Sequence, residues 1–198
     1  MGKHAYTRGS GLLEVLLTKK RATKANSIIP LSYRKGKILD IGCGSFPYFL
    51  THTNFTEKYG IDPSLDLKLV KNKKINLSTQ DVSAKKLPFQ KDYFDIVTML
   101  AVFEHIDYDR LDFVLSETKR VLKREGILII TTPAPWSDKL LHFMALFDLI
   151  SKEEIHEHKH HYDKASIEKI LIKTGFQKNK IKSGYFEMGL NMWFAGKK

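Results

Sequence analysis

Three aspartates and a turn with two glycines are the residues of this chain whose types and spacing could do chemistry. Asp40 lies two residues before Gly42, and the glycines at 42 and 44 would let the backbone approach a ligand where a Cβ would collide. Asp62, twenty residues after Gly42, is placed to accept hydrogen bonds from both hydroxyls of a ribose, and Asp81 follows the next apolar segment. A carboxylate beside the turn favours a cationic ligand and would repel a pyrophosphate. The spacing predicts a site for a cationic nucleoside.

Each of these features also has a purely structural alternative. Two glycines suit any tight turn between a strand and a helix. Asp62, with Pro63 and Ser64 after it, could begin a helix as its N-cap, a role that is compatible with ligand binding. Asp81 could lie in a surface turn.

Alternating strand and helix patterns would position the three acids. Short runs rich in β-branched residues predict strands at 37–41, 58–62, 94–100 and 127–132, with further strands at 75–80, 176–183 and 188–196. Helical spacing predicts a helix from Leu111 to Leu122 with Gly126 as its stop, and a second helix from near Asp163 to before Gly175. This succession predicts an α/β fold with a doubly wound sheet, in which the strand ends gather the acids along one rim.

Length and composition indicate one compact domain. The chain has 198 residues, 42% of them apolar, and we divide it into a helical N-terminal extension at 1–33 and a domain at 34–198. The single cysteine, Cys43, forms no internal disulfide, and we expect it to pack behind the turn rather than act as a nucleophile. We expect a cytoplasmic protein without a signal peptide. No membrane span is expected, since the longest apolar run, 140–150, is about half of the roughly 20 residues required.

The formal net charge is +11, from 33 basic residues against 22 acidic ones. Such an excess could attract nucleic acid or an anionic membrane. Only six of the basic residues are arginine, however, and the lysines are spread from Lys3 to Lys198, whereas recognition of phosphates and bases favours arginine. The composition therefore argues against a nucleic-acid partner.

Six motifs follow one another between residue 37 and about residue 176, namely ILDIGCG, YGID, QDVSAKKLPF, DYFDIVTMLAVFEHI, RVLKREGILIITTP and HHYDKASIEKILIKTGF. In this order they resemble the class I S-adenosylmethionine-dependent methyltransferases, especially the small-molecule branch related to quinone biosynthesis. The resemblance implies S-adenosylmethionine as cofactor and a mostly parallel, seven-stranded Rossmann-like sheet in the order 3-2-1-4-5-7-6. It also implies that Asp40, Gly42 and Gly44 line the methionine part of the donor, that Asp62 holds the ribose, and that Asp81 and Val82 meet the adenine.

The glycine turn departs from the pattern of this family, because Phe46 stands where a third glycine is usual and Pro47 follows it. We therefore do not carry Phe46 over as a contact of the donor. A nicotinamide-dependent oxidoreductase is the nearest alternative, but its G-x-G-x-x-G fingerprint would need glycine at Pro47 and gives no role to Asp40. A basic RNA-binding module and a protein that senses the donor without catalysis are further alternatives.

The predicted chemistry, in-line displacement of a methyl group, depends mainly on positioning, and some acceptors also require a general base. Glu104 and His105 follow the strand at 94–100, where the resemblance places a residue near the reacting methyl group. His105 could equally be a structural histidine. The tract 156–161 could form a lid that brings one of His160, His161 or the following Tyr162 to the acceptor.

Two segments leave the acceptor open between a small molecule and a lipid-linked one. The tract from His156 to His160 contains H-E-x-x-H, but the next helix is predicted to begin at Asp163, so we expect no metal. The run 140–150 predicts a core helix, with a cover over an apolar acceptor or a lipid-docking patch as alternatives. Residues 100–103 lack the Asn/Asp-Pro-Pro-aromatic signature of enzymes that methylate amino groups in nucleic acids.

Overall fold

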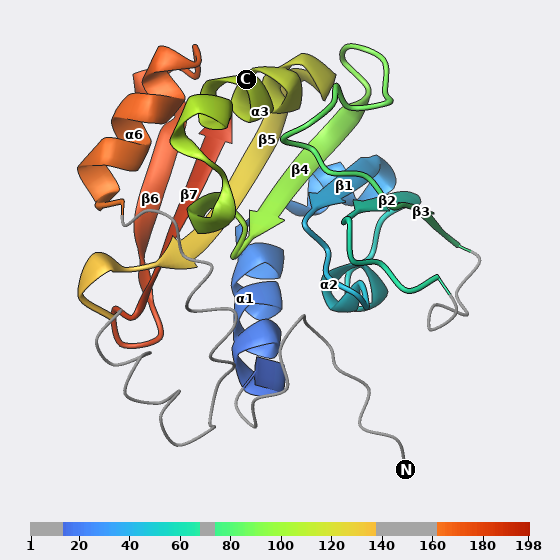
Figure 1. The fold of residues 1–198 in the computed structure, drawn as a ribbon, viewed down its shortest axis with the longest axis horizontal. Helices are drawn as coiled ribbons and strands as arrows, with labels where there is room; N and C mark the ends of the chain where they lie inside the picture. Colours follow the sequence, from blue (N-terminus) through green and yellow to red (C-terminus); the bar gives the residue numbers. More distant parts are fainter. Residues whose placement is uncertain (1–13, 68–73, 138–161) are drawn as a thin grey trace.

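The computed structural model describes residues 14–67, 74–137 and 162–198, and within these ranges the strands form one sheet (Figure 1). The strands are β1 (Lys37–Ile41), β2 (Glu57–Ile61), β3 (Ile75–Ser78), β4 (Phe94–Leu100), β5 (Leu122–Pro133), β6 (Ile181–Phe186) and β7 (Asn191–Lys197). Their order is β3-β2-β1-β4-β5-β7-β6, and β7 runs antiparallel to both of its neighbours. The predicted α/β class, with a doubly wound, mostly parallel, seven-stranded sheet in this order, is confirmed.

The central strands agree best with the sequence pattern. β1 and β4 have the predicted bounds, because both are mainly apolar, mostly buried strands in the middle of the sheet. The predicted late strands are displaced, since 178–180 forms the short 3-10 helix η4 (Lys178–Lys180) and β6 begins only after it. The prediction of Gly126 as a helix stop is wrong. α3 ends at Val121, and Gly126 lies inside β5, where a register shift separates the pairs Phe94–Leu122 and Ile96–Ile127.

Helices cover both faces of the sheet (Figure 1). α1 (Glu14–Ile28), the 3-10 helix η1 (Leu31–Lys35) and α2 (Tyr48–Thr51) contribute to the apolar cluster on one face, and α3 (Tyr108–Val121) and α6 (Lys164–Lys173) to the cluster on the other. In β1, Leu39 and Ile41 belong to the cluster under α3 and α6, whereas Ile38 belongs to the cluster under α1 and α2. Successive side chains of a strand point to opposite faces, so one short strand serves both cores.

The helix of the predicted N-terminal extension packs onto the same sheet as the rest of the chain. Ala22 and Ala25 are buried against the cluster that contains Ile38 and Ile96, and their small side chains let α1 lie close to the strands. The division at residue 33 stays a prediction, and residues 1–13 lie outside the described part.

α6 begins and ends as its sequence predicts. Asp163 is the N-cap, and its carboxylate accepts a hydrogen bond from the Ser166 backbone N–H at 2.7 Å. Gly175, just beyond the helix, has a φ of 92°, which a side chain would disfavour. Ile167 and Leu171 are fully buried against the core.

Replacing a buried α3 side chain should test this packing. Leu115 is fully buried, so Leu115→Ala should lower the free energy of unfolding by roughly 2 to 5 kcal/mol through lost burial and a residual cavity. Urea unfolding measures the change. Leu31→Ala is the control, since Leu31 is 85% exposed, and an equal loss in both variants would contradict the assigned core.

Candidate active site

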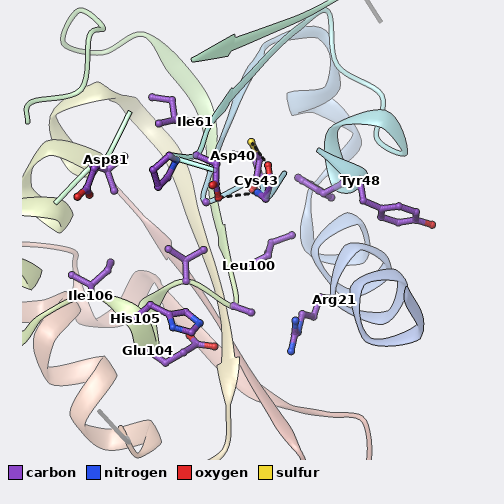
Figure 2. A pocket seen from close by; sticks show the side chains of 18 of the residues that line it. Arg21, Asp40, Cys43, Tyr48, Ile61, Asp81, Leu100, Glu104, His105 and Ile106 are labelled. Atoms are coloured by element: carbon purple, nitrogen blue, oxygen red, sulfur yellow. Dashed lines mark hydrogen bonds between the residues drawn. The ribbon is translucent and has the colours of Figure 1, made fainter. Parts of the chain in front are cut away.

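A cleft of about 330 Å³ opens where β1, β2 and β4 end, within the volume range typical of small-molecule sites (Figure 2). All the predicted donor-binding residues line it, namely Asp40, Gly42, Gly44, Asp62, Asp81 and Val82. His105 lines the same cleft. The structure therefore brings together an acid near the end of β1 with acids that follow β2 and β3, as the strand pattern predicts.

The turn after β1 requires glycine for two physical reasons. Gly42 and Gly44 have φ values of 71° and 77°, in the left-handed region that side chains disfavour. A Cβ on Gly42 would also collide with the side chain of Val102, which follows β4. The Gly42 N–H donates to the Ile61 carbonyl at 2.7 Å, so the turn is tied to the end of β2.

Asp62 is a buried carboxylate that organises this side of the cleft. Its Oδ2 accepts from the Gly44 N–H at 2.9 Å, and its Oδ1 accepts from the Ser64 N–H at 2.7 Å and the Ser64 hydroxyl at 2.5 Å. These contacts fix the orientation of the carboxylate before any ligand binds. The alternative in which Asp62 begins a helix is wrong, because residues 62–67 form turns.

Asp81 adjoins a turn and also lines the cleft, so the surface-turn interpretation is compatible with the predicted role in ligand binding, which stays a prediction. Its Oδ1 accepts from the Ser83 N–H at 2.8 Å and from the Ser83 hydroxyl at 2.5 Å. β3 ends at Ser78, two residues before its predicted end, and Asp81 and Val82 follow in the connection toward β4. The turn presents the side chains of both residues at the cleft.

Asp40 is almost completely buried and has an unusual proton affinity. Its carboxylate accepts a hydrogen bond from the Thr98 hydroxyl at 2.6 Å. Burial raises the pKa of Asp40 to about 7, the Thr98 hydrogen bond opposes this rise, and the nearby charge of Asp62 adds to it. A cation bound beside Asp40 would favour its ionised form.

Cys43 is buried behind the turn, as predicted. Burial raises the pKa of its thiol well above the usual value, and the charges of Asp40 and Asp62 add to this effect. The neutral thiol is therefore the stable form, which argues against a nucleophilic role.

The segment after β4 is held in a strained conformation. Ala101 has a φ of 57°, a value that is uncommon for a residue with a side chain. The 3-10 helix η2 (Phe103–His105) follows, with Phe103 fully buried in the core. This anchor directs Glu104 and His105 to the cleft (Figure 2).

Several side chains that complete the cleft carry no distinctive sequence signal. Thr18 and Arg21 reach it from α1, Gln80 from the connection after β3, and Phe46, which the resemblance leaves out, lines it too. The three-residue spacing of Thr18 and Arg21 places both on one helix face. That spacing alone does not distinguish them from the other polar residues of α1.

Tyr162 is a predicted catalytic residue that the structure does not place in the cleft. Its ring makes an edge contact with Phe103, with ring centroids 5.2 Å apart, and it packs against the core. The other predicted catalytic residue, His161, lies outside the described residues, as do the H-E-x-x-H tract and the apolar run 140–150.

Two features are absent from the described part of the chain. No group of three or more His, Cys, Asp or Glu side chains that could hold a metal ion occurs within 14–67, 74–137 and 162–198. Over the same ranges, no helix combines the length and apolar character needed to cross a membrane.

Comparison with known proteins agrees with this geometry. Residues 39–130 match a family model described as a methyltransferase domain. Among curated proteins, an uncharacterised protein of Methanocaldococcus jannaschii is 33% identical over 95 residues, which cover 47% of this chain and 39% of that protein. The chain thus matches well under half the length of this relative.

Solved structures share the fold at low sequence identity. A chain from the complex between the Haloferax volcanii Trm112 methyltransferase activator and a methyltransferase has a TM-score of 0.74 and 15% identity, covering 93% of this chain and 91% of its own. A SAM-dependent methyltransferase from Archaeoglobus fulgidus has a TM-score of 0.68 and 18% identity, covering 93% and 94%.

The sheet order and the acid-lined cleft define a Rossmann-like fold with a nucleoside-type site. Together with the match of residues 39–130 to a methyltransferase domain model, they make this chain similar to class I methyltransferases such as the Archaeoglobus fulgidus protein, which depends on S-adenosylmethionine. The chemistry of the cleft fits this cofactor, because the buried acid Asp40 lies beside the open glycine turn and Asp62 is oriented at the end of β2.

Replacing Asp40 should show that its burial makes the stability of the fold depend on pH. Because the pKa of Asp40 is about 7 in the folded protein against 3.8 for the ordinary side chain, stability from this group is complete below pH 4 and is lost as pH rises to 7. Asp40→Asn removes the titration, so its unfolding free energy relative to wild type should rise by a few kcal/mol between pH 4 and pH 8. Urea unfolding at both pH values measures this. A difference that does not depend on pH would contradict the assignment.

Proposed function

We propose that this chain is an S-adenosylmethionine-dependent methyltransferase that acts on a small-molecule or lipid-linked acceptor. The observation that carries the proposal is the buried Asp40 next to a glycine turn, in one cleft with Asp62 and Asp81. A sulfonium nucleoside with an amino acid tail presents cationic groups, two ribose hydroxyls and a base. Carboxylates can attract its cationic groups and accept hydrogen bonds from its hydroxyl and N–H groups. The quinone-related branch stays a prediction from the motifs.

Each part of the donor has a corresponding group in the cleft. Asp40 would attract the cationic methionine part, for which Gly42 and Gly44 leave room. Asp62 would accept hydrogen bonds from the ribose hydroxyls, because its carboxylate lines the cleft and is already oriented by Gly44 and Ser64. Asp81 and Val82 would meet the adenine.

The bound donor supplies an activated methyl group, and the chain holds the donor and the acceptor in position for the transfer. Holding two reactants in attack geometry lowers the activation free energy by on the order of 7 to 11 kcal/mol. His105, on η2, lies at the cleft where it could border the acceptor and accept a proton from it. We propose no catalytic role for Tyr162, because its ring packs against the apolar core and it is not among the residues that line the cleft.

A lipid-linked acceptor is supported by the surface of α1 beside the cleft. Leu16 is 49% exposed, and Lys19 and Lys20 are exposed near it. Thr18, between them, lines the cleft. An apolar side chain flanked by lysines favours contact with an anionic lipid surface, which would bring a lipid-linked substrate to the opening.

Calorimetric titration with S-adenosylmethionine, S-adenosylhomocysteine and NAD tests the proposed donor. We expect both sulfur nucleosides to bind and NAD not to bind. Asp62→Ala should cost a few kcal/mol of donor affinity, because hydrogen bonds to charged groups are worth roughly 1.5 to 3 kcal/mol each. Ser64→Ala, which removes one support of Asp62, should cost less. An unchanged affinity in Asp62→Ala would remove Asp62 from the site, and binding of NAD alone would favour the oxidoreductase.

The role of His105 is tested with the acceptor that co-purifies with the protein, identified by mass spectrometry. His105→Ala should lower turnover, measured by transfer of a radiolabelled methyl group, and leave donor affinity close to wild type. If turnover and acceptor affinity both remain at wild-type values, His105 does not border the acceptor.

A further inference from the structure

One carboxylate of the cleft is left without a role by the proposed donor contacts. Glu104 belongs to η2, is 3% exposed and lines the cleft. Both of its carboxylate oxygens are buried and accept no hydrogen bond from the described residues. Asp40 and Asp62, by contrast, each accept at least one.

A buried carboxylate in this state is energetically unfavourable. An unpaired buried charge loses its hydration and gains nothing in return. The conformation that holds it is itself strained, since Ala101 has a φ of 57° three residues earlier. Such a cost at the wall of a cleft is typical of a group whose partner is a ligand.

Arg21 is the cation of the described chain that shares this cleft with Glu104. It lines the cleft from α1, and in Figure 2 both side chains border the space below Leu100. No ion pair joins these two described residues. Arg21 lies instead within electrostatic reach of Glu187, whose pKa is raised mainly by burial and is lowered by the charge of Arg21.

Arg21 Nε and Thr18 Oγ1 in this cleft are also buried without a hydrogen-bond partner, so the two unpaired oxygens of Glu104 constrain the chemistry of the group that Glu104 itself contacts. Two carboxylate oxygens need at least two hydrogen-bond donors. A hydroxyl supplies one donor, whereas an ammonium supplies three and adds a favourable charge. A nitrogen group satisfies Glu104 and a hydroxyl does not.

The position of Glu104 assigns this partner to the acceptor rather than to the donor. In Figure 2, Asp40 and Cys43 lie on one side of Leu100, and Glu104 with His105 lies on the other. We propose that the acceptor of this cleft carries an amine and that Glu104 holds it through N–H donors. This inference rests on the proposed function, because it takes the other half of the cleft as the donor site.

Methylammonium, an alkylamine small enough to enter a pocket of this size, provides a direct test. The protein is first saturated with S-adenosylhomocysteine, and NMR then follows the backbone amides of residues 103–106 at constant ionic strength. We expect a saturable shift in the wild type and an affinity at least tenfold weaker in Glu104→Gln. Methanol has one donor and tetramethylammonium has none, so neither should cause a saturable shift.

Two control variants distinguish a ligand-binding role of Glu104 from a general charge effect and from a role in folding. Asp109→Asn removes an exposed charge at the start of α3 and should bind methylammonium as the wild type does. The free Glu104→Gln protein should melt at a temperature no lower than the wild type, whereas a lower melting temperature would show that Glu104 serves the fold.

The outcomes that would overturn the inference are equal binding of methylammonium by wild type and Glu104→Gln, binding of tetramethylammonium as tight as that of methylammonium, or no saturable shift in the wild type. Any of these with S-adenosylhomocysteine still bound refutes the amine alone. Failure of S-adenosylhomocysteine to bind would refute the proposed function instead.

Discussion

The burial of carboxylates at the strand ends is the constraint on which the rest of the structure depends. The chain has a net charge of +11, yet Asp40, Asp62 and Glu104 are each 3% exposed at one cleft. Such burial is unfavourable in the free protein, as the raised pKa of Asp40 shows. A cationic ligand offsets this cost only when it binds. Under the proposed function, affinity for a cation would therefore come from acids buried by the fold rather than from charges at its surface.

The strands and turns around these acids hold them in fixed positions at the edge of the sheet. β1, β2 and β4 lie side by side and parallel, so their carboxyl ends open at one edge of the sheet. The glycine turn, the Asp62 carboxylate and the Ala101 conformation then fix backbone and side chains without a ligand. Both apolar clusters extend beneath this edge, through Ile41 on one face and Cys43 on the other. Preorganisation of this kind lowers the entropy cost of binding.

Sequence patterns predicted the fold well and the site in part. Mostly buried central strands such as β4 are rich in apolar residues, and a glycine turn followed by strand-end acids has one favourable arrangement in a parallel sheet. These features could therefore be predicted from the sequence. The bounds of the edge elements could not be predicted. In β6, the pairing with β7 overrides a weak local preference, and β5 extends past Gly126 through a register shift. Arg21 and the burial of Glu104 depend on contacts between distant segments, which no local pattern encodes.

The most direct measurement is the number of protons released when S-adenosylmethionine binds, obtained by calorimetry in buffers of different ionisation enthalpy. If the buried acid beside the glycine turn receives the cation, binding at pH 6 releases about one proton, and the release disappears near pH 8. Binding heats that are independent of the buffer at pH 6 would contradict the account, since the acid would then keep its proton and the cleft would not be built for a positive charge.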